Sequence, residues 1–438
     1  MTKAELKQKV CQAIEAKQEQ IMALGESIYR EPELGFKETK TAAKVEEIFR
    51  ALGVTYEKGL ALTGVKGRLK GKRSNRTVAV LGELDAVTCA GHPGADPLTG
   101  AAHCCGHNIQ IAVLMAVGMA LQDTGAMDFL AGDVVLFAVP AEEYVEITYR
   151  NKLREEGKIA YLGGKQELIY RGAFDDIDMA LQMHVLTNTA ADSFVRLGST
   201  SNGFIGKLVQ YQGKAAHAAM APAEGINALN AAMLGIMGIH AQRETFREQD
   251  YVRFHPIITQ GGDLVNVIPE DVRMESYVRA ASIEALRDSN IKIDRALRAG
   301  ADAVGAEVSI QSLPGYLPMH NNQALNQVFR ANAEAVYGQT QVVAGTHEAG
   351  STDTGDLSHI LPTIHPWLAC VSGALHSKDY SVADSHAAYI KSAQALAMTL
   401  IDLLYGDGEA AEQILREYKP LLTKEQYVNF LNSFNQAN

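Results

Sequence analysis

The stretch RTVAVLGELDA, residues 76–86, is a short apolar run rich in valine that ends on acidic residues. A run of this length and composition predicts a β-strand with both faces buried. Its acidic end then stands at the carboxyl edge of a sheet, where open α/β proteins bind their ligands. The stretch therefore predicts both a fold class and the place at which a functional site should lie.

Three further runs repeat this pattern along the chain. They are DVVLFAVPAEE (133–143), IDMALQMHV (177–185) and IHPWLACVSGALH (364–376). Helical patterns lie between them, over residues 108–122 and 387–406. Strands that alternate with helices predict an α/β fold with a mostly parallel sheet.

The middle of the chain has a different order of elements. From residue 198 to residue 314 the pattern reads strand, helix, strand, strand, helix, strand, which is the split βαβ motif of ferredoxin-like α+β domains. We expect a discontinuous α/β domain, residues 1–197 and 315–438, that is interrupted by an inserted α+β domain, residues 198–314. The last segment, from Gly408 onward, is interpreted as surface helix without chemistry.

Composition restricts the kind of partner. The 438 residues carry a formal net charge of −11, which argues against a nucleic-acid or anionic-membrane partner, because both require a basic face. Five cysteines are too few and too scattered for a disulfide framework, and the N-terminus has no secretory signal pattern. No run reaches the ~18 uninterrupted apolar residues of a membrane span. We expect a soluble, cytoplasmic protein that acts on a small molecule.

The segment AAHCCGHN, residues 101–108, holds the densest group of reactive side chains. Cys105 and His107 flank Gly106 in a loop that opens a helix, with Asn108 as the expected N-cap. The glycine lets the backbone fold tightly enough for both side chains to face one metal ion. Cys104 is interpreted as a small buried apolar residue. A redox pair is disfavoured because adjacent cysteines rarely form a disulfide, and no partner signature supports a thiol protease.

Other strand ends supply complementary groups. In PAEE, residues 140–143, Glu142 and Glu143 follow an apolar strand, and their joint use requires the chain to turn there. One carboxylate would be a metal ligand and the other a general base. His184 closes the run 177–185 and His376 closes the run 364–376, while Asp85 is a natural hydrogen-bond acceptor behind a ligand.

Taken together, these motifs resemble a known family of metal-dependent amidohydrolases and peptidases. It includes aminoacylases, carboxypeptidase G, auxin-conjugate amidohydrolases and p-aminobenzoyl-glutamate hydrolases, and the likeness is to its cysteine-ligand branch. The similarity covers nearly the whole chain. It includes REPELGFKETKTA (30–42), LDA (84–86), HCCGHN (103–108), PAEE (140–143), MHV (183–185), GKAAHAAMAPAEGINALNAA (213–232), NVIPEDVRMESYVR (266–279), GSTDTGD (350–356) and HSKDY (376–380).

The resemblance implies a metallopeptidase-like catalytic domain, the discontinuous one, and an inserted lid and dimerisation domain. It implies that five residues bind two divalent ions; thiolate and imidazole ligands suit zinc, and a site with a carboxylate can also take manganese. The five residues are Cys105, His107, Glu143, His184 and His376. Glu142 would be the general base for a metal-bound water that attacks the amide. His217 would polarise the substrate carbonyl from the inserted domain of the partner subunit, which makes a homodimer part of the site.

The same resemblance places Asn266, Arg279 and Asp353 on the substrate side, with Arg279 holding a substrate carboxylate. Two features depart from the family pattern. Asn108 stands where relatives have Asp, which removes a negative charge behind the metal ligands. The segment 87–102, with His92 and Asp96, replaces a shorter one and is expected to reshape the pocket or to form a surface loop.

The sequence thus predicts metal-dependent hydrolysis of the amide bond of an N-acyl or N-aroyl amino acid, with p-aminobenzoyl-glutamate as the leading substrate. A dipeptidase or carboxypeptidase is the alternative, and a requirement for a free substrate amino group would identify it. A non-catalytic metal-binding or regulatory protein is the alternative of another class. Glu142 argues against it, because a protein without turnover needs no base beside a ligand.

Overall fold

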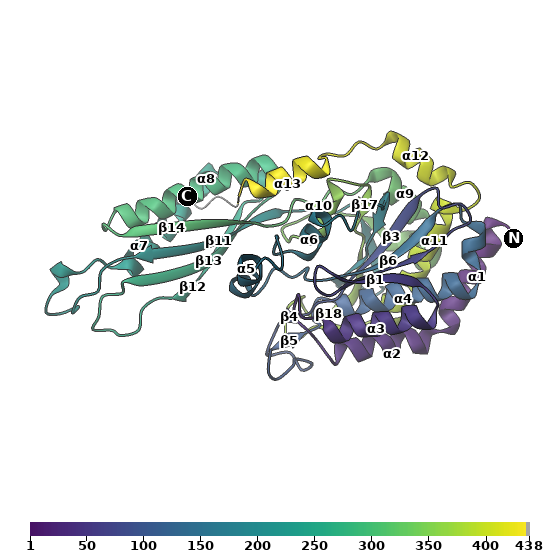
Figure 1. Ribbon diagram of the computed structural model, residues 1–438, viewed down its shortest axis with the longest axis horizontal. Coiled ribbons are helices and arrows are strands. Elements are labelled where there is room, and N and C mark those ends of the chain that lie inside the picture. The colour runs from purple at the N-terminus through teal and green to yellow at the C-terminus, as the bar shows by residue number, and fades with distance from the viewer. Residues whose placement is uncertain (435–438) are drawn as a thin grey trace. The chain divides into compact units, whose positions relative to one another are not determined.

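The computed structural model describes residues 1–434, which form two compact units (Figure 1). The first unit comprises Met1–Thr200, His320–Thr346 and Asp356–Lys424. The second comprises Ser201–Met319, His347–Gly355 and the described residues from Glu425 on. Residues 435–438, the last of the predicted discontinuous domain, lie outside the described residues.

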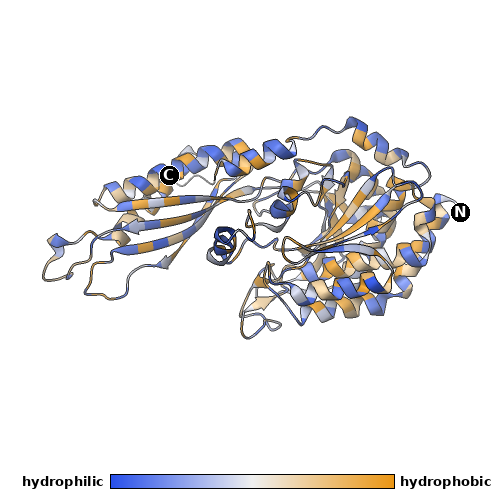
Figure 2. Cartoon of the chain, viewed as in Figure 1, coloured by the Kyte–Doolittle hydropathy of each residue, from blue (hydrophilic) through white to orange (hydrophobic). Residues whose placement is uncertain are grey.

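The first unit is built on a six-stranded sheet. Its order is β1 (Thr55–Leu60), β2 (Gly64–Leu69), β6 (Asp133–Val139), β3 (Thr77–Glu83), β7 (Met179–Leu181) and β17 (Thr363–Ile364). The pairs from β6 to β17 are parallel, whereas β1 and β2 add an antiparallel edge. Every residue of β3 and β6 is buried, and Figure 2 shows apolar residues along these central strands. The predicted mostly parallel α/β fold is confirmed.

The predicted strand over residues 177–185 is two strands. β7 ends at Leu181, and β8 (His184–Thr187) begins after a break and pairs with β18 (Trp367–Ser372) in a second sheet. That sheet also contains β9 (Phe194–Leu197), β15 (Val342–Ala344) and β19 (Ser381–Val382). His184 therefore opens a strand rather than closing one, because the chain passes from one sheet to the other just before it.

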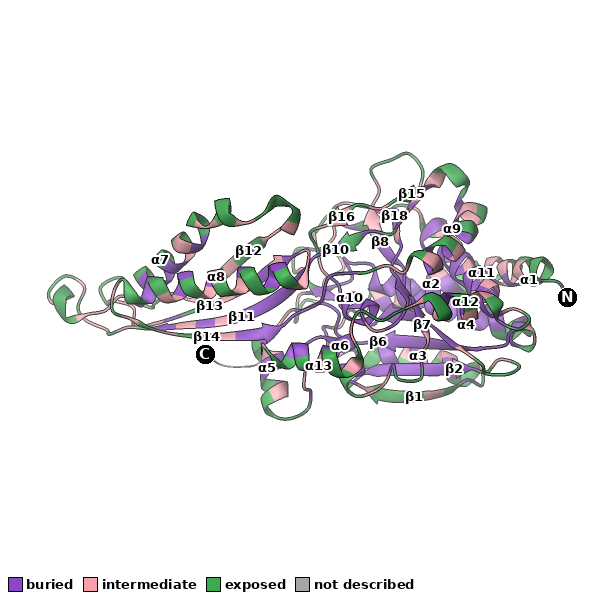
Figure 3. Ribbon diagram, turned by 90° about the horizontal axis from the view of Figure 1, so that it is seen from above, coloured by how far each residue is buried: buried purple, intermediate pink, exposed green. Residues whose placement is uncertain are grey.

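Helices bury the sheet. The central one is α4 (His107–Asp123), of which residues 107–121 are all buried, as expected of a helix that is apolar on all sides. In Figure 3 the region around α4 and α11 is mostly purple, the colour of buried residues. Around α4 lie α1 (Lys3–Ala16), α2 (Gln18–Tyr29), α3 (Thr39–Ala51) and α11 (Ser392–Leu404), which a π-helical turn, His386–Lys391, precedes. Further helices of the unit are α5 (Ile147–Glu155), α6 (Gly164–Tyr170), α9 (Gln323–Tyr337) and α12 (Glu409–Glu417), and the short α10 (Thr354–Ser358) begins at its boundary.

The segment 87–102 is an ordered loop. The strands β4 (Val87–Thr88) and β5 (Ala101–Ala102) close its base as an antiparallel pair. The buried His92 lies with its Nε2 atom 3.1 Å from the carbonyl of Tyr380. Asp96 accepts hydrogen bonds from the amides of Leu98 and Thr99, at 3.0 and 2.8 Å. The His92 contact joins the loop to the segment that follows His376, and the Asp96 contacts form a turn within the loop.

The second unit has an antiparallel sheet in the order β12 (Arg253–Gln260), β13 (Asp271–Ala280), β11 (Gly203–Gln212) and β14 (Glu307–Pro314). The helices α7 (Ala228–Ala241) and α8 (Ile283–Asp302) cover one face (Figure 3). This is the βαββαβ order that the sequence predicts. The helix α13 (Lys424–Asn432) follows near the end of the chain. No helix in residues 1–434 is long and apolar enough to cross a membrane.

Candidate metal centre

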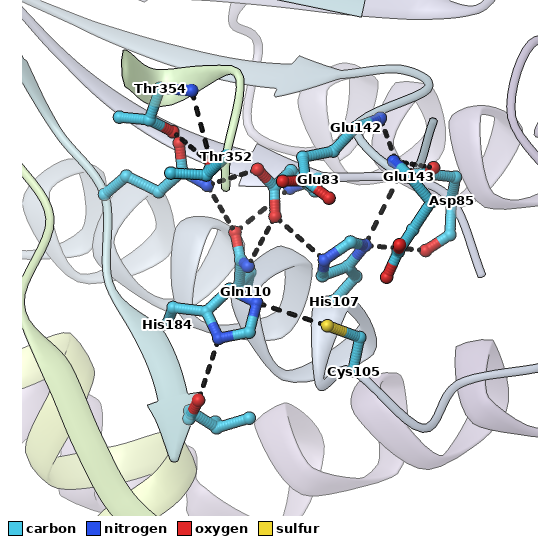
Figure 4. A network of polar contacts seen from close by, with 12 residues as sticks. Glu83, Asp85, Cys105, His107, Gln110, Glu142, Glu143, His184, Thr352 and Thr354 are labelled. Carbon is cyan, nitrogen blue, oxygen red and sulfur yellow. Dashed lines mark hydrogen bonds and ion pairs between the residues drawn. The ribbon is translucent and has the colours of Figure 1, made fainter. Parts of the chain in front are cut away.

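A cluster of ionisable side chains lies at the carboxyl edge of the main sheet of the first unit (Figure 4). The ends of β3 and β6 deliver carboxylates, the start of α4 delivers a thiol and an imidazole, and β8 and the loop after β18 deliver further imidazoles. The five predicted metal ligands, Cys105, His107, Glu143, His184 and His376, all lie in this cluster. Four of them are buried, and His376 stands at the rim.

Cys105 is the centre of the cluster. Its Sγ lies 3.4 Å from Nε2 of His184 and 3.2 Å from Nε2 of His376. Donor atoms of Cys105, His107 and His184 lie within 4.8 Å of one another, and so do those of Cys105, Glu143 and His376. Because the thiol belongs to both groups, the arrangement can hold two ions that share one sulfur.

The turn into α4 requires a glycine. Gly106 has φ +85°, and a Cβ atom there would lie 2.3 Å from Cγ2 of Val185. Gly106, and not Asn108, flanks the helix, so the predicted N-cap role of Asn108 is wrong. Asn108 lies within the first turn, where its side-chain amide donates to the carbonyl of Gly25 at 3.2 Å and to the hydroxyl of Tyr389 at 3.3 Å.

Asp85 organises the acidic side of the cluster. β6 ends at Val139, and Ala141 adopts φ +54°, which turns the chain as the use of both glutamates requires. The amides of Glu142 and Glu143 then donate to the Asp85 carboxylate at 3.2 and 2.9 Å. On its other side, the backbone carbonyl of Asp85 lies 2.9 Å from Nδ1 of His107. A proton on Nδ1 leaves Nε2 of His107 as the ligating nitrogen.

The charges of the cluster are coupled. Burial and the Glu143 carboxylate raise the pKa of the Cys105 thiol, but the surrounding imidazoles outweigh them and bring this pKa to about 6. A thiolate, the form that binds metal, is therefore accessible at neutral pH. Burial also raises the pKa of Glu143, but His376, 2.8 Å away, lowers it to about 2. The same carboxylate raises the pKa of His376 to about 12.

The residues present fit divalent metal ions. Thiolate, imidazole and carboxylate are the ligands of zinc, and the carboxylate and imidazoles also suit manganese. Among the described residues, the buried atoms His107 Nε2 and Glu143 Oε1 make no hydrogen bond of good geometry, although charged neighbours lie close to both. Buried lone pairs in this condition are available to a cation.

The predicted substrate residues lie in the second unit. His217 is exposed and its Nδ1 accepts from the amides of Ala219 and Met220, at 3.2 and 3.1 Å. Its neighbour Ala218 donates to the carbonyl of Asn266 at 2.9 Å, which brings these two predicted residues together. On β13, Arg279 donates from Nη1 to Ser351 at 2.7 Å and lies over the rings of Phe204 and Tyr277. Asp353 is fully buried.

Sequence reasoning missed Glu83, the last residue of β3. Its Oε2 atom lies 3.0 Å from Nε2 of His107, and it forms a third potential ligand group with His107 and Glu142. Figure 4 shows the His107 ring between Glu83 and Asp85. The spacing of Glu83 and Asp85 could have identified it. Two acidic residues two positions apart at the end of a buried strand point to the same side of the chain.

Comparisons with known proteins give a consistent picture. Residues 79–402 match Peptidase family M20/M25/M40. An Xaa-Arg dipeptidase of Mus musculus is 30% identical over 97% of this chain and 94% of its own length. The IAA-amino acid hydrolase ILR1-like 4 of Arabidopsis thaliana is 26% identical over 76% of this chain and 73% of its own length. A dinuclear metal binding peptidase from Bacillus subtilis has a similar structure, with TM-score 0.65 and 20% identity over 89% of this chain and 99% of that chain.

The two adjacent cysteines provide an internal comparison. We expect Cys105→Ser to weaken metal binding more than about 100-fold, because both ligand groups lose their shared thiolate. Cys104→Ser, at a fully buried position outside both groups, should keep the metal and lose about 1 kcal/mol of folding free energy. Elemental analysis and chelator competition on the two purified variants measure this difference. Equal metal affinity in both would remove Cys105 from the site.

Proposed function

Because the chain belongs to peptidase family M20/M25/M40, we propose that it hydrolyses the amide bond between an amino acid and the acyl group on its nitrogen, in a dipeptide or an N-acyl amino acid. The protein is a metal-dependent hydrolase of amides. The observation that carries the proposal is the position of Cys105 in two overlapping ligand groups, with the nearly buried Glu142 beside them.

In this proposal each group has a separate task. Cys105, His107, Glu143, His184 and His376 would hold two divalent ions, zinc or manganese. When bound, such a pair polarises a carbonyl and lowers the pKa of water toward neutrality. Glu142 would accept the proton of the attacking water and return it to the leaving nitrogen. Its backbone amide donates to Asp85, which fixes the turn that carries both glutamates, and its carboxylate would act as the base while Glu143 binds the metal.

The comparisons support a dipeptide as the first substrate candidate. A relative that matches nearly the whole chain is named for dipeptides that end in arginine, so we propose a dipeptide with a basic C-terminal residue. Conjugates of an amino acid with an organic acid, including p-aminobenzoyl-glutamate, are the second candidate, supported by the IAA-amino acid hydrolase. In either case Arg279 would bind the substrate carboxylate, with Asn266 and Asp353 shaping the substrate side.

Exposed apolar side chains of the second unit support a homodimer. The surface of this unit exposes large apolar side chains that a monomer would leave in water. They include Met233, Leu234 and Met237 on α7, Ile257 and Ile258 on β12, and Val265. We propose that this surface pairs two copies of the chain and that His217 of each copy completes the site of the other. We also propose a cytoplasmic location, because all five cysteines are free, which suits a reducing compartment.

Glu142→Gln tests the proposed base. The substitution keeps the size of the side chain but cannot accept a proton, so we expect kcat to fall by about 10²- to 10⁴-fold while metal content stays unchanged. Hydrolysis rate and elemental analysis of the same preparation give both values. Retained activity would contradict the assignment of Glu142 as the base.

Substrate class is tested with matched compounds. An alanyl-arginine dipeptide, acetyl-arginine, alanyl-glutamate and p-aminobenzoyl-glutamate differ in the amino group or in the residue released. We expect the fastest release of free amino acid from alanyl-arginine. Preference for p-aminobenzoyl-glutamate would favour the second candidate, and no turnover of any of the four by metal-loaded protein would contradict the proposed function.

Mixed dimers test the role of His217. Glu142→Gln and His217→Ala are each expected to be inactive alone. If His217 serves the partner's site, their co-expression creates one intact site in each mixed dimer, and activity should return to about a quarter of the unaltered level. Continued inactivity of a mixed dimer, verified by two affinity tags, would place His217 in its own subunit's site or outside catalysis.

A further inference from the structure

The turn that carries Glu142 and Glu143 has an unfavourable backbone conformation. β6 ends at Val139, and two residues later Ala141 has φ +54°, a region in which the Cβ atom of an L-residue crowds the backbone. On a regular strand the two glutamate side chains would point to opposite faces. The proposed site therefore depends on contacts that keep Ala141 in this conformation.

Glu38 supplies such a contact at the amide of Ala141. It is fully buried, and its Oε1 atom accepts a hydrogen bond from that amide at 2.8 Å. Its Oε2 atom accepts from the hydroxyl of Thr63 at 2.7 Å, which orients the carboxyl group. An uncharged amide side chain of the same shape could replace both contacts, because a threonine hydroxyl can accept as well as donate.

Arg150 supplies a contact at the carbonyl of Ala141. Its guanidinium is fully buried and donates from Nη1 to this carbonyl at 3.3 Å and to that of Leu162 at 2.9 Å. The amide of Gly164 donates to the same Ala141 carbonyl at 3.0 Å. Because both the amide and the carbonyl of Ala141 are bonded, a change of either of its backbone dihedral angles would break a hydrogen bond.

The segment that carries Glu38 packs closely against the turn. It belongs to residues 30–42, a stretch of family resemblance to which the proposed function assigns no task. A Cβ atom at Gly35 would lie 2.2 Å from Nη2 of Arg150 and 3.0 Å from Cα of Ala141. A glycine is therefore required for this approach, and the segment is in place to hold the turn.

A helix cap does not account for Glu38. The residue stands directly before α3, but its carboxylate makes no capping hydrogen bond to that helix. It reaches instead to Ala141, 103 positions further along the chain. A buried carboxyl group that bonds a strained backbone amide so far away calls for an explanation at the turn itself.

We propose that Glu38 is a positioning residue that, together with Arg150, holds Ala141 in the turn and so directs Glu142 and Glu143 toward the metal ions. The inference rests on the proposed function, in which the two glutamates are the base and a ligand. Glu38 touches neither substrate nor metal in this proposal and acts only through the backbone of Ala141. Loss of its acceptor would let Ala141 relax toward negative φ and move both carboxylates out of place.

The test compares Glu38→Met, which removes the acceptor, with Glu38→Gln, which retains it. Chelator competition gives Zn²⁺ affinity, the absorption spectrum of Co²⁺-loaded protein reports ligand geometry, and alanyl-arginine gives kcat and KM. We expect Glu38→Met to bind Zn²⁺ about 10- to 100-fold more weakly, to shift the Co²⁺ spectrum and to lower kcat more than it raises KM. Glu38→Gln should stay within about fivefold of the unaltered protein in each value.

Asp133→Leu is the matched control. Asp133 stands at the opposite end of β6 and is likewise buried. It also accepts from one backbone amide, that of Gly71 at 3.0 Å, and from one hydroxyl, that of Ser74 at 2.5 Å, and it pairs with Arg68 at 2.9 Å. Its replacement should lower the melting temperature without changing Zn²⁺ affinity, the Co²⁺ spectrum or kcat.

Ala141→Gly separates positioning from general stability. Glycine adopts positive φ without a steric penalty, so adding this substitution to Glu38→Met should restore part of the lost Zn²⁺ affinity and kcat. The proposal is overturned if Glu38→Met behaves like Asp133→Leu, if Glu38→Gln loses as much as Glu38→Met, or if Ala141→Gly restores nothing.

Should Glu38→Met fail to fold, Thr63→Val decides by the same readouts, because it removes only the hydroxyl that orients Glu38. We expect it to lower Zn²⁺ affinity and kcat by about two- to tenfold, and no change in either would overturn the proposal. Zn²⁺ affinity tests the inference even if none of the offered substrates is hydrolysed. Unaltered protein that binds neither Zn²⁺ nor Co²⁺ would instead contradict the metal site itself, which separates failure of the proposed function from failure of this inference.

Discussion

The structure depends on the concentration of negative charge at one edge of a buried sheet. A thiol and four carboxyl groups lie there with less than a tenth of their surface exposed: Cys105, Glu83, Asp85, Glu142 and Glu143. Buried charges of one sign are strongly unfavourable unless hydrogen bonds, counter-charges or metal ions compensate them. The neighbouring elements supply groups that compensate these buried charges. Backbone amides donate hydrogen bonds to Asp85, and Lys165 forms an ion pair with Glu83. The histidines and the proposed metal ions would compensate the remaining charges.

Such a cluster requires backbone conformations that regular strands and helices do not supply. Gly106, Ala141 and His376 all have positive φ, and each stands at or beside a residue of the site. For the two residues with a Cβ atom this region is strained, and strain of this kind persists where the surroundings fix the conformation. At Ala141 the guanidinium of the fully buried Arg150 donates to its carbonyl at 3.3 Å. At His376 the amide donates to the carbonyl of Cys104 at 2.9 Å.

Several strands and most of the candidate metal ligands could be predicted from the sequence, because local sequence patterns report local structure. The apolar run 76–86 predicts β3, and the βαββαβ order predicts the second sheet. The short motifs identify Cys105 and His107 as candidate ligands, and the structure places them in one cluster with the other three. The break inside 177–185 could not be predicted, since a continuous apolar run does not reveal that the chain changes sheets. The residue type of Asn108 predicts an N-cap, whereas Gly106 occupies that position and forms the turn. Lys165 lies in an ordinary helical segment, and only the folded chain shows that it is buried against Glu83.

A crystal structure of the Zn²⁺- or Mn²⁺-loaded protein, with anomalous scattering from the metal, tests whether Cys105 is shared by two ions. We expect two metal ions about 3.5–4 Å apart, both bonded to Sγ of Cys105, with Glu142 and Glu83 outside the ligand sphere. A single ion, or two ions of which neither contacts Cys105, would contradict the shared thiolate on which the proposed site is built.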